Sequence, residues 1–371
     1  MSRALKAILI LLAVSFLVLL LTIRKKHNKI SSGLIIFHAG SLGFPLKQIC
    51  QEFGRHYAEV RIVREAAGSR LCARKITDLN RPCDIIASSD YTVIDTLLIP
   101  GYADWNIKFA SNEIVIAFSE DSHKAGDINK DNWYDILLEK DVAFGRSDPN
   151  ADPCGYRAVF TITLAEKFYN KPGLAAKLLA KDKRHIRPKE VDLLALLEVG
   201  ELDYIFTYRS VAEQHELKYI RLADEINLKR AEFADIYKSV SVSLTGKKPG
   251  TRITKTGVPI VYGVTMPKNA PNRKLALAFL AFLLDADKGG AILEKNGQTF
   301  LVPSPTDTFD KIPDSLKRFA LPVGTEDRGQ RTEDRGQRTE DRRQRTEDGG
   351  QKTEDRGQRT EDRGQILASD F

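Results

Sequence analysis

The sequence predicts an α/β protein of two lobes with a ligand-binding cleft between them. From Gly33 onward, short β-rich runs alternate with amphipathic helical patterns, which is typical of parallel sheets covered by helices. A strand pattern at Ile114 leaves the first sheet, and a long apolar run from Val258 returns to it. This order indicates that the second lobe is inserted into the first, and the cleft between such lobes is the default ligand site.

The individual elements follow from local patterns. Short runs rich in β-branched and aromatic residues predict strands. Apolar residues that recur every three or four positions, as from Leu46 to Tyr57, predict helices. We expect strands at 34–38, 60–65, 84–87, 114–118, 142–145, 204–208 and 258–267, and helices over 44–57, 127–138, 156–164 and from 190, with two more over 272–297 that are broken at Gly289 and Gly290.

These patterns divide the 371 residues into four parts. Residues 1–30 form a signal peptide or a membrane anchor. Residues 33–118 and 258–324 form lobe 1, and residues 119–257 form lobe 2. Residues 325–371 form a tail outside the folded body.

The first part contains a hydrophobic helix. Ala7–Ile23 is an uncharged run of seventeen residues that follows Arg3 and Lys6 and precedes RKKHNK. This length is short for a membrane span and long for the core of a signal peptide. No small-residue cleavage motif follows it. An uncleaved anchor and a cleaved export signal therefore both remain open, and in either case the body is exported.

The tail repeats the heptapeptide TEDRGQR, with small variations, from Thr325 to Gln365. A period of seven is also that of a coiled coil, but no position of this repeat is apolar, so there is no seam to bury. We expect the tail to be disordered. The net charge of the whole chain is +7, but residues 31–324 carry 40 Lys/Arg and 37 Asp/Glu. This near balance argues against a nucleic-acid partner.

Four cysteines occur without a CxxC pair or a zinc-ligand spacing. In an exported protein Cys72 and Cys83 are close enough in sequence to form a disulfide. Free buried thiols are the alternative, and the sequence leaves both open.

Four polar turns each precede a helical pattern: AGSLGFP, AAGSR, SDPNADPCGYR and RPKE. The N–H groups at a helix N-terminus can bind an anion, although ordinary N-capping explains any single turn equally well. In an α/β sheet, however, the turns that follow successive strands gather at one edge, where ligands bind.

Two other interpretations of SDPNADPCGYR are weak. Asp148, Asn150 and Asp152 have the spacing of a calcium loop, but Pro153 stands where glycine is needed. Cys154 lies at a helix start that would lower its pKa, as in a nucleophile, but no histidine stands in a catalytic context. We expect no enzymatic activity and no cofactor.

Six stretches resemble, in order and spacing, the archaeal-type tungstate/molybdate-binding proteins of ABC importers. The resemblance covers about residues 33–324 and not the tail. It implies a periplasmic-binding-protein fold of type II, whose lobes close on an oxyanion on the outer side of the cytoplasmic membrane. It also implies a monomer that hands its ligand to a permease with a separate ATPase. The stretches are AGSL, EAAGSRLCARKI, YADWNIKFASNEIVIAF, DNWYDILL, SDPNADPCGYR and YRSVAEQHELKYI.

The resemblance also implies a set of ligand-binding residues. Ser41 and Ser69 match serines that donate hydrogen bonds to the oxyanion, and Asp152 matches an aspartate that approaches the molybdenum or tungsten centre. The amide of Cys154 and the side chain of Tyr208 match groups used by related bacterial molybdate binders.

One position departs from the family pattern. The family's FEY is FTY here, so Thr207 stands where a second carboxylate is expected to complete six-coordination of the metal centre. A hydroxyl at this position shifts the expectation toward hydrogen-bonded tetrahedral binding and weakens the basis for rejecting sulfate. Glu190 is a substitute carboxylate in principle, with helix capping as its favoured role.

The resulting expectation is a solute-binding protein that captures molybdate or tungstate for an ABC importer. Two alternatives remain: a receptor for a sulfate- or phosphate-type oxyanion, and a membrane-anchored sensor or degenerate receptor with weakened binding.

Overall fold

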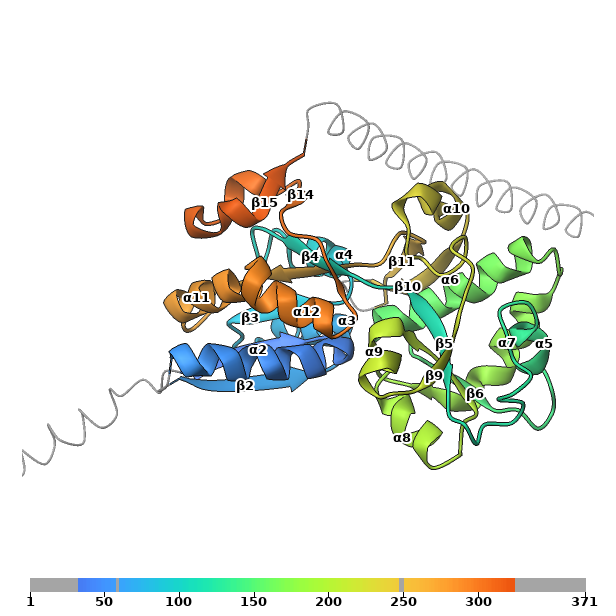
Figure 1. The fold of residues 1–371 in the computed structure, drawn as a ribbon. Coiled ribbons are helices and arrows are strands. Elements are labelled where there is room, and N and C mark those ends of the chain that lie inside the picture. Colours follow the sequence, from blue (N-terminus) through green and yellow to red (C-terminus); the bar gives the residue numbers. More distant parts are fainter. Residues whose placement is uncertain (1–32, 58–59, 247–249, 324–371) are drawn as a thin grey trace, which may run out of the picture. The chain divides into compact units, whose positions relative to one another are not determined.

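The computed structural model describes residues 33–57, 60–246 and 250–323 (Figure 1). The predictions for the N-terminal hydrophobic segment and for the repeat tail concern residues outside these ranges. Within them, no helix combines the length and the hydropathy that a bilayer crossing requires. The α/β fold class is confirmed, because two separate sheets are each covered by helices on both faces.

The first sheet has six strands in the order β13-β4-β12-β3-β1-β2. Strand β1 pairs in parallel with β2 and β3, whereas β12 runs antiparallel to β3 and β4, and β13 runs antiparallel to β4. The strands are β1 (Gly33–His38), β2 (Arg61–Ala66), β3 (Ile85–Ser88), β4 (Ile107–Ser111), β12 (Val261–Thr265) and β13 (Thr299–Phe300).

Helices cover both faces of this sheet because successive strand residues point to opposite sides. Ile36 and Ile85 belong to the core under one group of helices, and Phe37 and Ile86 belong to the core under the other. The first group is α2 (Gly43–His56), α11 (Arg273–Leu283) and α12 (Ala291–Lys295), and the second is α3 (Ser69–Thr77), α4 (Tyr91–Val93) and η2 (Ile94–Leu98).

The second sheet has five strands in the order β7-β6-β8-β5-β9. Strand β6 pairs in parallel with β7 and β8, and β5 runs antiparallel to β8 and β9. The strands are β5 (Ile114–Phe118), β6 (Phe144–Ser147), β7 (Ile186–Arg187), β8 (Tyr204–Tyr208) and β9 (Lys218–Arg221). Its helices are α5 (Trp133–Ile136), α6 (Pro153–Phe168) and α7 (Leu174–Lys181) on one face, with α8 (Asp192–Glu198) and α9 (Arg209–Gln214) on the other.

The remaining elements are short. Strands β10 (Ser241–Thr245) and β11 (Arg252–Thr256) form an antiparallel pair, and Leu244 of this pair packs into the core of the second sheet. The others are α10 (Ala234–Lys238), β14 (Ser304–Thr306), β15 (Ala320–Pro322), η1 (Gly40–Leu42), η3 (Asp182–His185), η4 (Ala231–Phe233), η5 (Ala286–Gly290), η6 (Phe309–Lys311) and η7 (Asp314–Phe319).

We call the residues around the six-stranded sheet lobe 1 and those around the five-stranded sheet lobe 2. The predicted first boundary, after Phe118, is wrong for one strand, because Ile114–Phe118 pairs within the second sheet. The chain passes from β4 to β5 through Asn112 and Glu113. Local hydropathy could not reveal this, because an apolar strand reads the same in either sheet.

Three further predictions need correction. Both sheets are mixed and not parallel, since β5 and β12 are antiparallel to their neighbours. The break between the two helices expected over 272–297 lies at Leu284 and Asp285, directly after α11, and not at the glycine pair. Gly289 instead allows a close approach, because a Cβ there would lie 2.2 Å from the carbonyl oxygen of Leu283. The helix expected over 127–138 is reduced to the single turn of α5.

All four cysteines are free in the structure, which decides between the two alternatives for Cys72 and Cys83. Burial raises the pKa of the Cys72 thiol to about 12, and it also raises the pKa of the Cys83 thiol. Both thiols are therefore protonated at neutral pH.

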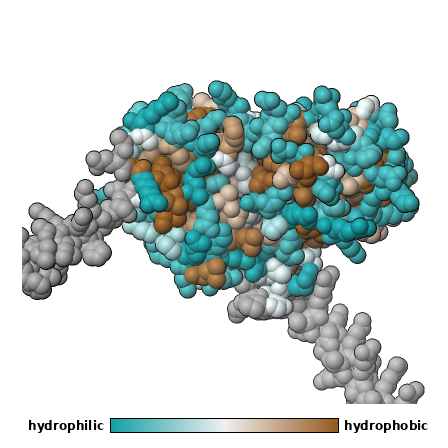
Figure 2. Space-filling view, turned by 90° about the horizontal axis from the view of Figure 1, so that it is seen from below, coloured by the Kyte–Doolittle hydropathy of each residue, from teal (hydrophilic) through white to brown (hydrophobic). Residues whose placement is uncertain are grey.

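The surface of the described residues is mostly hydrophilic on the face drawn in Figure 2, where hydrophobic side chains form small separate patches. The exposed large hydrophobic residues are correspondingly scattered over many elements: Phe44, Tyr57, Val63, Leu79, Phe168, Val199, Ile236 and Leu321.

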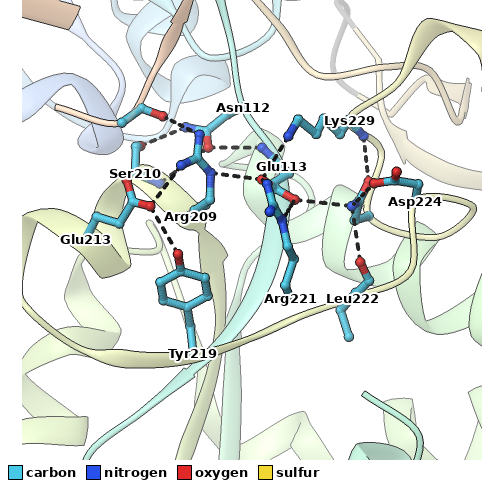
Figure 3. A network of polar contacts seen from close by, with 12 residues as sticks. Asn112, Glu113, Arg209, Ser210, Glu213, Tyr219, Arg221, Leu222, Asp224 and Lys229 are labelled. Atoms are coloured by element: carbon cyan, nitrogen blue, oxygen red, sulfur yellow. Dashed lines mark hydrogen bonds and ion pairs between the residues drawn. The ribbon is translucent and has the colours of Figure 1, made fainter. Parts of the chain in front are cut away.

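A buried carboxylate holds in place the segment of Asn112 and Glu113, which joins the two lobes and is called the crossing segment below. Glu113 is 1% exposed and forms ion pairs with Arg209 at 2.8 Å, Arg221 at 2.9 Å and Lys229 at 3.4 Å (Figure 3). Arg209 follows β8, Arg221 ends β9, and Lys229 lies in the segment after β9, so Glu113 ties the crossing segment to lobe 2.

We expect Glu113→Gln to lower the free energy of unfolding by about 2–4 kcal/mol, because it leaves the three cations without their shared carboxylate. The lower part of this range applies if solvent screens Arg221, whose side chain is 58% exposed. Urea denaturation measures the change. The matched control is Glu120→Gln, which removes an exposed pair with Lys218 and should leave the unfolding midpoint unchanged. Equal effects of the two substitutions would contradict a structural role for Glu113.

Candidate functional site

The structure brings the four polar turns of the sequence together in pairs, each joining one turn of lobe 1 to one of lobe 2. A Cβ built on Gly40 of AGSL would lie 3.3 Å from both carboxylate oxygens of Glu190. A Cβ built on Gly68 of AAGSR would lie 2.4 Å from the carbonyl oxygen of Ala151 and 3.0 Å from the Cβ of Asp152. Only glycine permits the second approach, whereas a Cβ at Gly40 would require the side chains of Glu190 and Val191 to shift by a few tenths of an ångström.

Asp152 is the residue that connects the two turns of lobe 2. It is buried and caps the N-terminus of α6, where its Oδ1 accepts a hydrogen bond from the amide of Cys154 at 3.3 Å. Its Oδ2 accepts a hydrogen bond from the amide of Glu190 at 2.9 Å. The capping role expected of a polar turn is therefore present, and the second oxygen positions the RPKE turn.

Glu190 carries a second carboxylate at the same place. The side chain is buried, and neither of its carboxylate oxygens has a hydrogen-bond partner among the described residues. Its predicted capping role is wrong, because α8 has Val191 at its N-cap and no side-chain cap. A buried polar group without a partner costs about 1–3 kcal/mol, and more if it is charged.

The pKa of Glu190 reflects this environment. Burial raises the pKa well above its usual value, and the neighbouring Asp152 raises it further. The backbone amides of Glu190 itself and of Ser41 lie near enough to offset part of the rise, although neither forms a hydrogen bond with the carboxylate. The carboxyl group of Glu190 thus lies close to Asp152 and to the AGSL turn, in a setting that favours its neutral form.

The two candidate serines are buried and each has an acceptor lone pair occupied. The Oγ of Ser41 lies 3.1 Å from the hydroxyl of Tyr262. The Oγ of Ser69 accepts a hydrogen bond from the amide of Ser89 at 3.0 Å and lies 3.1 Å from the Oγ of Ser89. A hydroxyl whose oxygen already accepts has its hydrogen available to donate.

A buried arginine, Arg157, links the Ser69 side of the site to Tyr208. Its Nη1 donates to the carbonyl of Ser89 in lobe 1 and to the hydroxyl of Tyr208 in lobe 2, both at 2.7 Å. Burial raises the pKa of Tyr208 well above its usual value, so the phenol keeps its proton. Arg157 therefore places a positive charge in direct hydrogen-bond contact with Tyr208 and with Ser89, the residue that is hydrogen-bonded to Ser69.

The lobes make further polar contacts around this arginine. Asp90 of lobe 1 pairs with Lys255 at 2.7 Å and with Arg157 at 4.0 Å. Although burial opposes it, Lys255 and then Arg157 hold the pKa of Asp90 below its usual value. Two donors of lobe 1 also reach carbonyl oxygens of lobe 2. The guanidinium of Arg70 donates to Asn150 at 3.1 Å, and the amide of Leu71 donates to Ala151 at 3.3 Å.

Cys154 does not have the properties of a nucleophile. Burial raises the pKa of its thiol well above its usual value, and the nearby Glu190 and Asp152 raise it further. This is the opposite of the lowering expected from the helix N-terminus. The amide of Cys154, which the resemblance places on the ligand, donates to Asp152 in the structure.

Thr207 and Tyr208 are both fully buried at the end of β8. Strand alternation puts the side chain of Thr207 on the opposite face from Tyr208 and Phe206, whose face packs against α6. Its Oγ1 has no hydrogen-bond partner among the described residues. A direct role for Thr207 at the ligand stays a prediction.

Sequence reasoning missed Arg157 and Tyr262 altogether. Arg157 lies in the quoted SDPNADPCGYR stretch, among the apolar residues Tyr156, Val159 and Phe160 that predict the buried face of α6. A charged residue in such a position was the available signal. For Tyr262, within a long apolar strand run, we find no comparable signal.

Comparison with known proteins identifies the family to which this sequence and fold belong. Residues 34–299 match the family described as bacterial extracellular solute-binding protein. The chain belongs to this family. Its members bind solutes outside the cytoplasm.

Curated relatives cover most of this solute-binding protein. It is 50% identical to a solute-binding protein of Petrotoga mobilis over 78% of this chain and 90% of the relative. It is 48% identical to the molybdate/tungstate-binding protein WtpA of Pyrococcus abyssi, over 76% and 88%. It is 45% identical to the WtpA protein of Thermococcus kodakarensis, over 76% and 86%. The resemblance stated from the sequence is confirmed by these relatives.

Solved structures share the fold at low sequence identity. The periplasmic molybdate-binding protein of Azotobacter vinelandii is 16% identical, with a TM-score of 0.54, over 73% of this chain and 99% of that one. The sulfate-binding protein SubI of Mycobacterium tuberculosis is 13% identical, with a TM-score of 0.53, over 78% and 92%. The periplasmic-binding-protein fold expected of this solute-binding protein is thereby confirmed.

Proposed function

We propose that this solute-binding protein captures molybdate or tungstate for an ABC importer. The observation that carries the proposal is the buried carboxylate of Glu190, which lies beside Asp152 and has no hydrogen-bond partner in the part of the chain that the structure describes. When both are ionised, two carboxylates repel an oxyanion that is held by hydrogen bonds alone. They fit a molybdenum or tungsten centre, which accepts additional oxygen ligands, whereas the sulfur of sulfate does not.

In this proposal Glu190 supplies the carboxylate that was expected at position 207. It approaches from lobe 2 against Gly40, in the turn that also carries Ser41. Ser41 and Ser69 donate hydrogen bonds to the oxyanion oxygens, and Tyr208 contributes a third hydroxyl. The charge of Arg157 offsets part of the negative charge that the carboxylates and the dianion bring together.

The names of the two WtpA relatives support molybdate and tungstate as the ligands. The importer implies a permease and an ATPase as partners. If the N-terminal segment is retained as an anchor, it holds the receptor at the membrane and raises its effective concentration at the permease. The oligomeric state we propose is a monomer.

Isothermal titration of the purified protein with tungstate, molybdate, sulfate and phosphate tests the proposal. We expect the first two to bind at least about 100-fold more tightly than sulfate or phosphate, a difference of about 2.7 kcal/mol. Comparable affinity for sulfate would replace the proposal by a sulfate-type receptor. No binding of any of the four would favour a degenerate receptor.

A further inference from the structure

The orientation of one side-chain amide is fixed at the crossing between the lobes. Asn112 lies directly before Glu113, and its Oδ1 accepts hydrogen bonds from the backbone amides of Glu113 at 3.0 Å and Ser210 at 3.4 Å (Figure 3). Backbone N–H groups only donate, so this end of the amide is the oxygen. The Nδ2 group then points the other way and donates to the Oγ of Ser210 at 2.7 Å and to the hydroxyl of Tyr262 at 3.1 Å.

The direction of the hydrogen bond from Asn112 to Tyr262 fixes the direction of the hydrogen bond between Tyr262 and Ser41. Because the oxygen of Tyr262 accepts from Asn112, its hydrogen is directed to its other partner, the Oγ of Ser41, at 3.1 Å. Tyr262 is fully buried, and burial raises its pKa above the usual value, so it remains a donor at every physiological pH.

Ser41 is the end of this chain of donors. Its Oγ accepts from Tyr262, and its hydrogen is free to donate to a ligand. Its carbonyl oxygen accepts from the Nε2 of Gln298 at 3.2 Å, and the same Nε2 lies 3.1 Å from the Oγ of Ser210. The AGSL turn is thus connected to Ser210, in the segment after β8, by two routes, one through Tyr262 and Asn112 and the other through Gln298.

We propose that Tyr262 is a positioning residue that makes Ser41 a hydrogen-bond donor to the bound oxyanion. The chain of hydrogen bonds from Asn112 through Tyr262 to Ser41 connects the crossing segment between the lobes to the ligand. This inference rests on the proposed function and names residues of its site. Because the Ser41 hydroxyl already accepts a hydrogen bond from Tyr262, it donates its own hydrogen to the ligand. The ligand atom that Ser41 contacts must then be an acceptor, which is an unprotonated oxygen of the oxyanion.

The test is the substitution Tyr262→Phe, which keeps the buried ring and removes the donor to Ser41. We expect the dissociation constant for tungstate, measured by isothermal titration, to rise about three- to tenfold, the effect of one lost hydrogen bond. The matched control is Tyr237→Phe, which removes a buried hydroxyl bonded to Asp224 and Arg230 in lobe 2. We expect the control to leave the dissociation constant unchanged.

A double-mutant cycle separates positioning from a general structural role. In the Ser41→Ala background, Tyr262→Phe should cause no further change in tungstate affinity, because its only route to the ligand is gone. Additive losses from the two substitutions would overturn the inference, as would an unchanged affinity in Tyr262→Phe alone. In both cases tungstate binding by the wild-type protein would still support the proposed function. Absence of tungstate binding by the wild type would instead refute the proposed function itself.

Discussion

Replacement of Glu190 by glutamine is expected to weaken tungstate and molybdate binding by about 10- to 100-fold, which corresponds to about 1.4–2.7 kcal/mol. Glutamine has nearly the same shape, but a neutral amide does not replace a carboxylate as a ligand of the metal centre. Isothermal titration against tungstate and sulfate measures the loss. We expect the ratio of the two affinities to fall, because sulfate does not use the carboxylate.

The same substitution should change the pH dependence in a defined direction. The folded-state pKa of Glu190 is raised, so the folded protein keeps a proton that the unfolded chain has lost above about pH 4.5. The stability contributed by this group is therefore full below pH 4.5, falls as the pH rises to the folded pKa, and is constant above it. In Glu190→Gln this fall should be absent from a series of melting temperatures.

Ligand binding should have the opposite pH dependence, because the metal centre takes the ionised carboxylate. Tungstate affinity of the wild type is expected to increase as the pH rises through the raised pKa of Glu190, with release of a proton. The control is Glu198→Gln, which alters an exposed residue at the end of α8. Wild-type tungstate affinity and pH dependence in Glu190→Gln would refute the assigned role of this carboxylate.

The second large effect is expected from Gly68→Ala, which should prevent the lobes from closing. The added Cβ would lie 2.4 Å from the carbonyl oxygen of Ala151, a contact that backbone atoms do not tolerate. Gly68 has φ −56° and ψ 139°, which any residue adopts, so the substitution strains nothing within lobe 1. We expect tungstate affinity to fall about 5- to 150-fold, from the roughly 1–3 kcal/mol that overpacking costs.

Two measurements distinguish blocked closure from misfolding. Small-angle scattering should show a decrease in the radius of gyration of the wild type on addition of tungstate and no decrease for Gly68→Ala. The matched control is Gly54→Ala in α2, where no atom lies within 4 Å of the new Cβ, and which should bind as the wild type does. A Gly68→Ala protein that binds and compacts normally would show that the two lobes do not meet at this contact during binding.

Local signals in the sequence were sufficient for most of the elements and for part of the site. Strands 114–118 and 204–208 have the predicted bounds, because β-branched and aromatic residues mark them clearly. Ser69 and Asp152 begin or cap helices as the polar turns predicted, since capping depends on neighbours within a few residues. The sheet in which β5 pairs depends on distant partners, and the sequence could not provide it.

The role of Glu190 shows where sequence reasoning ended. A glutamate shortly before a helical pattern is typical of an N-terminal turn, and its local sequence is the same whether it caps or binds. The difference lies in Gly40, 150 positions earlier, whose missing side chain admits the carboxylate. Cys154 gives the same lesson, because its pKa depends on burial and not on its place at the start of α6.

The contacts of Asp90 and Arg157 between the lobes have a consequence for the rate of ligand release. The ion pair of Asp90 with Lys255 and the hydrogen bond of Arg157 to Ser89 must break before the lobes separate. Their strength therefore sets a barrier to dissociation that is independent of which oxyanion is bound. We expect slow spontaneous dissociation for any ligand that closes the lobes, so that rapid delivery depends on a membrane partner that separates them.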